Sequence, residues 1–457
     1  MLKITKISDI YNNHEELSQL EKIKVGGWVK SIREVSKEII FIILNDGSTL
    51  DNLQMVISKK TFSQLGLLEK VNFGSSLLVN GKLLLTPQRK QSCELQVAEI
   101  ELINPVADYY PLQKKDIPLE VVRSVPHLRT KTNYFLVLFR LRHSISKAIH
   151  DFFHQEGFYY VPTPIITSND AEGAGEIFNL TTNEKEPFFP KSAKLTVSGQ
   201  LQAESLAQGL GKVYTFGPCF RAEKSHTTRH LAEFWMVEPE MTFTDLEGVI
   251  NLAERMIKHV VNHVLVNNNS ELKFLENYDE ENKKEIISKL KKFAGEKFKK
   301  IDYNKAIELL EKSKEIFVFN DIKWGMDLQS EHEKYLCQHF DNLPVFVINY
   351  PQELKAFYMK NNPDGKTVAG FDLLFPEIGE LIGGSMRENN YQLLQAKAQK
   401  IGLDVNNLNW YLILRQSGYA PSGGFGLGLE RLIMLISGTE NIRDTIAFPR
   451  FPGKLDF

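Results

Sequence analysis

Gly423-Gly424-Phe425-Gly426-Leu427-Gly428-Leu429-Glu430-Arg431 is the stretch of this chain that says most about its fold. Glycine stands at the alternate positions 424, 426 and 428, and large apolar residues stand between them. Side chains of a β-strand alternate between two faces, so the stretch predicts a strand with one bare face and one apolar face. Glycine inside a strand indicates that something approaches the backbone closely. A flat ligand on the bare face and a tight packing corner both explain the pattern.

Two arginines are placed to bind an anion. Arg431 follows the glycines at the start of a predicted helix, residues 430–436, which Gly438 would end. Arg221 lies in Phe220-Arg221-Ala222-Glu223, ahead of a polar loop that runs through Arg229-His230. A guanidinium is a planar, permanently charged donor fork that suits phosphate.

The loop leads into Glu233-Phe234-Trp235-Met236-Val237-Glu238-Pro239-Glu240 and is short enough to close a β-hairpin. Phe234 could stack on a base ring, and Glu238 would face the same pocket two alternations later. These segments resemble motifs 2 and 3 of the class II aminoacyl-tRNA synthetases. The first motif of that family resembles the amphipathic helix at about 138–156, which leads through Gly157 into Phe158-Tyr159-Tyr160-Val161-Pro162-Thr163-Pro164. In the family this helix forms the dimer interface, so the resemblance implies a homodimer.

The bulk composition is that of a globular protein. The chain has 457 residues, 42% hydrophobic and 25% charged, which suffices for two or three domains. It has no apolar run of membrane-spanning length and no signal or transit peptide, so we expect a cytoplasmic protein without a membrane segment. Three scattered cysteines argue against a disulfide framework and a zinc site. The net charge of −2 does not indicate a nucleic-acid partner.

The expected fold class is α+β, with an N-terminal OB-type β-barrel and a catalytic domain whose antiparallel sheet is flanked by helices. Five short strands and one helix before residue 104 predict the barrel. We expect the barrel at 1–104, a linker at 105–126 and the catalytic domain at 127–457. By resemblance Phe41 and Gln54 contact the anticodon, although Phe41 in an apolar run is also consistent with the core. Residues 267–316 are rich in Lys, Glu and Asn and predict charged surface helices, either solvated or in contact with tRNA.

Within the class the layout and several phrases resemble the asparaginyl enzymes. Leu195-Thr196-Val197-Ser198-Gly199-Gln200-Leu201 is one of them, and Ala203 stands where aspartyl enzymes carry a lysine for the substrate carboxylate. Asparagine offers an amide NH2 donor where aspartate offers only acceptors. Glu238 would accept from that NH2 and repel a carboxylate, and Arg387 would donate to the amide oxygen.

The resemblance implies a two-step reaction: asparagine and ATP form asparaginyl-adenylate, which then acylates tRNA(Asn). Arg221, Arg431 and Glu223 are the expected catalytic residues, and ATP is also expected to contact Arg229, His230, Phe234, Glu380 and Gly428. Mg2+ is expected at Glu380, with Asp372 as a second acid. The substrate asparagine is expected to contact Glu172, Ser198, Gln200, Glu238 and Arg387.

Three alternatives stay open from the sequence. A non-discriminating aspartyl enzyme would charge both tRNAs, but Ala203 and Glu238 argue against it. Asparagine synthetase of the class II type would lack the N-terminal barrel. A non-catalytic RNA-binding relative would have lost some of Arg221, Glu223, Glu380 and Arg431, and all four are present.

Overall fold

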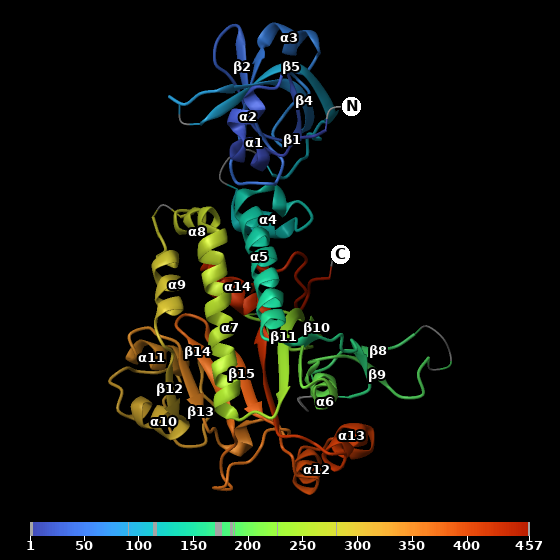
Figure 1. Ribbon diagram of the computed structural model, residues 1–457, viewed down its shortest axis with the longest axis vertical. Coiled ribbons are helices and arrows are strands. Elements are labelled where there is room, and N and C mark those ends of the chain that lie inside the picture. Colours follow the sequence, from blue (N-terminus) through green and yellow to red (C-terminus); the bar gives the residue numbers. More distant parts are fainter. Residues whose placement is uncertain are drawn as a thin grey trace. The chain divides into compact units, whose positions relative to one another are not determined.

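The structure is a computed structural model, which describes residues 3–89, 91–112, 117–169, 176–182, 186, 188–225, 227–279 and 281–455 (Figure 1). The chain forms two compact units, Met1–Val137 and Leu138–Phe457. The division lies inside helix α5 (Asn133–Gln155). Among the described residues, none of the helices combines the length and apolarity that crossing a bilayer requires.

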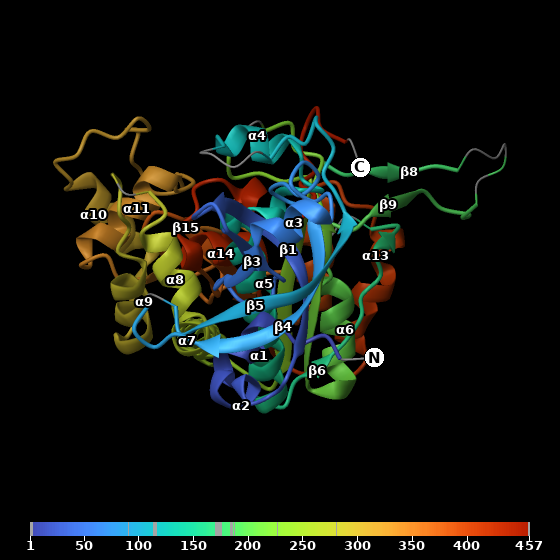
Figure 2. The same ribbon diagram turned by 90° about the horizontal axis from the view of Figure 1, so that it is seen from above.

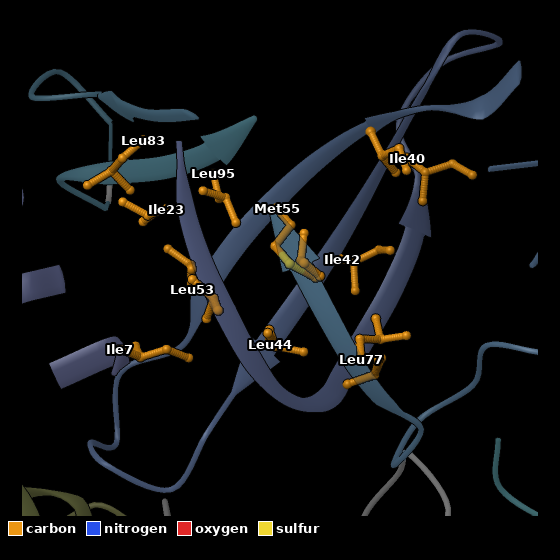
Figure 3. Close-up of a cluster of buried hydrophobic side chains, with 14 of the residues drawn as sticks. Ile7, Ile23, Ile40, Ile42, Leu44, Leu53, Met55, Leu77, Leu83 and Leu95 are labelled. Atoms are coloured by element: carbon orange, nitrogen blue, oxygen red, sulfur yellow. The ribbon is translucent and has the colours of Figure 1, made fainter. Parts of the chain in front are cut away.

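The first unit contains a closed five-stranded barrel in the order β1-β2-β3-β5-β4. Alternate residues of β2, namely Ile40, Ile42 and Leu44, point into the barrel and are fully buried (Figure 3). This two-residue alternation is what the sequence pattern predicts, and the OB-type barrel is confirmed. The elements of this unit are α1 (Ile7–Asn12), α2 (His14–Ser18), β1 (Ile23–Glu34), β2 (Ile39–Asn45), β3 (Leu53–Ser58), α3 (Lys59–Gln64), β4 (Ser76–Leu85), β5 (Cys93–Asn104), α4 (Leu119–Ser124) and η1 (Arg129–Lys131).

The second unit is built on an eight-stranded sheet in the order β12-β13-β14-β15-β16-β11-β10-β6, which is antiparallel except at its two ends. Helix α7 packs on β15 and β16, and α6 packs on β10 and β11 (Figures 1 and 2). The strands are β6 (Tyr159–Tyr160), β10 (Lys212–Phe220), β11 (Glu233–Thr242), β12 (Lys299–Asp302), β13 (Val345–Ile348), β14 (Gly370–Phe375), β15 (Gly379–Met386) and β16 (Ser422–Gly428), and β7 (Ile166–Thr167), β8 (Asn179–Leu180) and β9 (Ala193–Leu195) form a separate small sheet.

The helices of this unit follow the apolar periodicity of their sequences. The predicted helix after the glycines is α14 (Leu429–Ser437), and Gly438 ends it in the left-handed conformation that glycine adopts readily. The others are α6 (Gln200–Leu210), α7 (Leu246–Asn267), α8 (Asn269–Glu276), α9 (Ile286–Gly295), α10 (Tyr303–Glu311), α11 (Ser330–His339), α12 (Tyr391–Lys400), α13 (Val405–Leu412) and α14 (Leu429–Ser437), with η2 (Gln352–Leu354), η3 (Ile413–Gln416) and η4 (Ile442–Asp444).

The charged segment at 267–316 is more than a set of surface helices. Its strand β12 pairs with β13 in the main sheet, and Leu290, Phe293 and Tyr303 are buried. The predicted helices are present as α8, α9 and α10, but the segment also contains the strand β12 and contributes buried apolar residues to the domain. The sequence misled because the many charged residues of this segment hide a short apolar repeat on each helix.

One buried carboxylate joins the three sequence motifs. Oε1 of Glu430 on α14 accepts a hydrogen bond from Nη1 of Arg142 on α5 at 2.7 Å, and Oε2 accepts from the backbone N–H of Trp235 on β11 at 3.0 Å. Burial raises the pKa of Glu430, and the Arg142 charge opposes that shift. A buried charge that is paired and hydrogen-bonded fixes the relative positions of the elements that hold it.

Candidate active site

A pocket of about 210 Å³ lies where the β10–β11 hairpin meets β15, β16 and the start of α14. It brings together every residue that the sequence predicts to contact ATP. Its lining also includes Met236 and Leu381, which the sequence analysis did not single out because apolar strand residues of this kind are ordinarily core. The eight predicted residues in the lining are Arg221, Glu223, Arg229, His230, Phe234, Glu380, Gly428 and Arg431.

The alternate glycines serve two purposes. A Cβ at Gly424 would lie 2.1 Å from the carbonyl oxygen of Pro239, so close packing of β16 on β11 requires glycine there. A Cβ at Gly426 would lie 2.7 Å from Cε of Met236, whereas one at Gly428 would meet nothing within 4 Å. Glycine is therefore required for strand packing at position 424, whereas at position 428 it leaves the face of the strand open.

Two side-chain contacts lie on the side of the pocket that is next to the loop between β10 and β11. The guanidinium carbon of Arg221 lies 5.3 Å from the centre of the Phe234 ring, within the range of cation–π attraction. His230 Nε2 lies 3.5 Å from Oε2 of Glu223. A base that stacked on Phe234 would therefore lie beside the Arg221 guanidinium.

The other two arginines donate to backbone oxygens. Nη1 of Arg431 donates to the carbonyl oxygen of Glu380 at 2.8 Å, and Nη2 of Arg229 donates to the carbonyl oxygen of Glu377 at 3.4 Å. A carbonyl oxygen carries no formal charge, so these bonds orient the guanidinium groups without neutralising them. Both side chains remain partly exposed and can meet an anion.

Three carboxyl groups and one lysine meet beside this pocket. Nζ of Lys355 donates to Oδ2 of Asp372 at 2.6 Å, and the backbone N–H of Glu380 donates to Oε2 of Glu333 at 3.1 Å. Burial, and next the Glu380 charge, raise the pKa of Glu333 to about 8. Sequence patterns do not point to Glu333, because it lies on α11, 47 residues before Glu380, outside the recognised motifs.

The space beside Gly383 indicates whether Glu380 and Asp372 could hold a metal ion. A Cβ there would lie 2.9 Å from Oε1 of Glu380 and 3.6 Å from Oδ1 of Asp372, so both carboxylates face a space that glycine leaves open. Carboxylate oxygens are ligands that Mg2+ prefers. Across the described residues no group of three or more His, Cys, Asp or Glu side chains is arranged around a metal position. The pair thus fits a cation that takes its other ligands from phosphate and water.

Glu238 is a buried acceptor, 3% exposed. Oε1 accepts from the Ser198 hydroxyl, and Oε2 accepts from the backbone N–H of Gly199 at 2.9 Å. Burial raises its pKa, and these two bonds oppose the shift. A carboxylate has about four acceptor positions, so Glu238 can still accept from a ligand.

Arg387 is committed to a buried ion pair, which the sequence analysis did not foresee. Its Nε donates to Oε2 of Glu240 at 3.1 Å, its Nη2 donates to Oε1, and its Nη1 donates to Oγ of Ser385 at 2.8 Å. The Glu240 charge raises the pKa of Arg387 against the effect of burial. Three of five N–H groups are used, so two can still donate to a ligand, but the positive charge is already neutralised.

The other residues expected to bind asparagine fall into two groups. Ser198 and Gln200 are buried beside Glu238, and Nε2 of Gln200 has no hydrogen-bond partner within the part of the chain that the structure describes. A buried N–H donor without a partner calls for an acceptor such as a substrate carboxylate. Glu172 lies outside the described residues. Ala203 is fully buried in an apolar cluster with Val161, Ala207 and Val213.

The two residues expected to contact the anticodon differ in their surroundings. Phe41 on β2 is half-buried, and the guanidinium carbon of Arg33 lies 5.6 Å from its ring centre. Gln54 on β3 is 6% exposed, and its Nε2 donates to Oε2 of Glu94 at 3.2 Å. Phe41 presents part of a ring to solvent, whereas Gln54 is buried with one N–H bonded to Glu94.

Two family descriptions match the chain. The family "tRNA synthetases class II (D, K and N)" matches residues 120–452, and the family "OB-fold nucleic acid binding domain" matches residues 23–103. The first of these alone covers more than half of the chain.

Individual proteins match along the whole length. The chain is 47% identical over 459 residues to an asparagine–tRNA ligase of Mycoplasma mycoides, covering 99% of this chain and 100% of that one. It is 44% identical over 472 residues to the corresponding ligase of Alkaliphilus oremlandii, with 100% of both chains covered. The crystal structure of asparaginyl-tRNA synthetase from Pyrococcus horikoshii complexed with asparaginyl-adenylate superposes with a TM-score of 0.88 at 31% identity, covering 100% of both chains.

Proposed function

The chain belongs to the class II aminoacyl-tRNA synthetases of the aspartyl, lysyl and asparaginyl group, and we propose that it is the member that ligates asparagine to tRNA(Asn) with ATP. The activity is that of an ATP-dependent, AMP-forming asparagine–tRNA ligase, as in the full-length relatives. The residue roles below are proposals that rest on the geometry of the site.

The charge balance around Glu238 carries the assignment of substrate. Arg387 is paired with Glu240, and the charge of Arg221 also acts on Glu238, so Glu238 brings a second buried carboxylate to this end of the site. A neutral amide can donate its NH2 to Glu238 and accept from a remaining N–H of Arg387. An aspartate carboxylate would meet a buried negative charge instead, and Ala203 supplies no cation to offset it.

In the first step the asparagine carboxylate oxygen attacks the α-phosphorus of ATP, and pyrophosphate leaves with the P–O electron pair. Nε2 of Gln200 would donate to the attacking carboxylate and orient it. Arg221 would neutralise the α-phosphate and Arg431 the terminal phosphate, while Phe234 holds the adenine ring. In the second step a hydroxyl of the tRNA terminal adenosine attacks the acyl carbon, and AMP leaves. Positioning and charge neutralisation suffice for both steps.

Mg2+ would be held by Glu380, with Asp372 in support, and would supply charge neutralisation for the phosphates. Glu223 would accept from the adenine amino group or the substrate ammonium group across the loop, and Arg229 and His230 would contact the outer phosphates. These roles are consistent with the place of all these residues in or beside one pocket.

For the barrel we propose that Phe41 stacks on an anticodon base, because its ring is part-exposed beside Arg33. Phe41→Ala should raise the KM for tRNA and leave ATP–pyrophosphate exchange unchanged. An unchanged KM for tRNA would assign Phe41 to the barrel core.

We also propose that the protein is a cytoplasmic homodimer. Tyr159 and Tyr160, directly after α5, are 60% and 53% exposed on the edge strand β6 of the large sheet. Exposed aromatic residues on a sheet edge are typical of an interface. Sedimentation equilibrium of the full chain would test the dimer, and a monomer at micromolar concentration would disprove it.

The decisive experiment is ATP–pyrophosphate exchange with purified protein, with asparagine and aspartate compared side by side. We expect exchange with asparagine only. Equal exchange with aspartate would identify a non-discriminating enzyme, and no exchange with either in a protein that binds tRNA would identify a non-catalytic relative.

A further inference from the structure

A second and larger cavity adjoins the nucleotide pocket. Its volume is about 1050 Å³, and it lies among α9, α11 and α14 and the turn at 376–378. Arg229 and Arg431 line both cavities, so the two are neighbours at the side where the terminal phosphate of ATP is placed. None of the predicted contacts with asparagine or adenine lines this second cavity, and of the residues given a role in the first step only Arg229 and Arg431 reach it.

The lining of this cavity is rich in cations. Six cationic and three acidic residues line it within the described ranges, so positive charge is in excess. The charged segment at 267–316 supplies three of the lysines, with Lys289 and Lys292 three residues apart on one face of α9. The charged residues of the lining are Arg229, Lys284, Lys289, Lys292, Lys334, Arg431, Glu285, Glu377 and Glu440.

Some of these cations are already occupied. Nζ of Lys289 lies 2.8 Å from Oε2 of Glu377, and Nζ of Lys284 lies 2.9 Å from Oε1 of Glu440. Both partner carboxylates are mostly exposed, so solvent screens these pairs and an anion can compete for the lysines.

Lys334 on α11 differs from the other lysines. Within the described residues its ammonium group makes no hydrogen bond or ion pair, although the side chain is half-buried. Burial lowers its pKa, and the nearby positive charge of Arg229 lowers it further, while Glu377 and Glu333 oppose the shift. Two cations held near each other at a half-buried position are stabilised by an anion that lies between them.

We propose that this cavity binds inorganic pyrophosphate as it leaves the enzyme. Lys334 and Lys289 are its principal contacts. The inference rests on the proposed function, because pyrophosphate is the product released beside Arg431. The cavity is wide enough for a hydrated pyrophosphate ion and shares the two arginines that would hold the departing phosphates. A tRNA backbone would instead call for basic residues spread along an open face.

The kinetic test uses Lys334→Ala and Lys289→Ala, with Lys291→Ala as the matched control, because Lys291 lies on the same helix as Lys289 but is exposed and outside the cavity lining. We expect each lysine variant to raise the KM for pyrophosphate in the exchange reaction by about fivefold, and the double variant by more, as for loss of one partly screened charge contact. The KM values for ATP and asparagine, and the KM for tRNA, should match those of Lys291→Ala.

Calorimetry separates this proposal from the proposed function. Inorganic pyrophosphate titrated into the full-length protein should bind more weakly to Lys334→Ala than to wild type or Lys291→Ala, whether or not asparagine supports exchange. Failure of asparagine-dependent exchange in the wild type would overturn only the proposed function. Unchanged affinity and unchanged KM for pyrophosphate in the double variant would overturn the assignment of this cavity to pyrophosphate. A rise in the KM for tRNA alone would also overturn it and would identify the cavity as a tRNA contact.

Discussion

The two ends of the proposed active site hold their charged groups in opposite ways. At the amino-acid end Ser198, Gln200, Glu238, Glu240 and Arg387 are all buried, and the charged groups are bonded to protein partners before any ligand arrives. At the proposed nucleotide end the arginines, Glu223 and Glu380 are partly exposed, although Asp372 is buried, and Arg229 and Arg431 each donate to a backbone carbonyl oxygen.

This difference matches what each end must do. A buried, prearranged set of partners rejects a wrong substrate, because a wrong group leaves a buried charge or donor unsatisfied. Partly exposed cations instead reserve their charge for phosphates that change during the reaction. Selectivity should therefore depend on the amino-acid end and rate on the nucleotide end.

Removal of a nucleotide-end charge should have the largest effect. Arg431→Ala should reduce asparagine-dependent pyrophosphate exchange about 1000-fold, because the positive charge that meets the leaving phosphates is lost. Its melting temperature should stay within a few degrees of wild type, since the side chain is partly exposed. Arg431→Lys should recover part of the rate, and exchange near the wild-type level in Arg431→Ala would show that the charge is not used.

Breaking the buried pair at the amino-acid end should instead affect stability. Glu240→Gln leaves the Arg387 charge without its partner carboxylate and should lower the free energy of unfolding by about 3–5 kcal/mol, measured by urea denaturation. The double variant Glu240→Gln/Arg387→Gln should be more stable than the single variant, because no uncompensated charge remains. Equal losses of unfolding free energy in the single and the double variant would show that the unpaired Arg387 charge is not what destabilises Glu240→Gln.

Glu238→Gln should weaken selectivity with a smaller effect on folding. The amide can keep a bond to Ser198 or Gly199 but no longer repels a carboxylate. We expect the ratio of kcat/KM for asparagine over aspartate to fall about 100-fold in the exchange assay. Glu233→Gln, at the first residue of β11 and only partly buried, serves as the control. An unchanged ratio in Glu238→Gln would remove this residue from the recognition of substrate.

The smallest expected effect is on the pH dependence of the ratio of kcat/KM for asparagine over aspartate. Burial raises the pKa of Glu238, so its carboxylate gains a proton at a higher pH than an ordinary glutamate does. As pH falls the repulsion of aspartate is therefore lost, and selectivity for asparagine should drop at a higher pH than protonation of an ordinary glutamate would allow. Glu238→Gln should show no such slope, and a wild-type ratio independent of pH would indicate that Glu238 keeps its charge throughout.

Local sequence patterns predicted most of the fold and picked out the candidate ATP contacts, whose roles stay predictions. The glycine strand, the helix after it and the β10–β11 hairpin depend on residues near one another in sequence, and all eight residues predicted to contact ATP line one pocket. The pairing of Arg387 with Glu240 and the position of Glu333 were missed, because each depends on contacts between distant segments. The buried core of the 267–316 segment was missed because its composition is dominated by charged residues.

The bond network of Glu430 has a consequence for how the protein is made. Arg142 precedes Glu430 by 288 residues, and Trp235 precedes it by 195. During synthesis from the N-terminus, the first and second motifs must therefore wait for nearly the whole chain before their shared carboxylate exists. Any nascent or truncated chain that stops before α14 leaves these partners without it, so the three motifs can take up their shared arrangement only after α14 has been made.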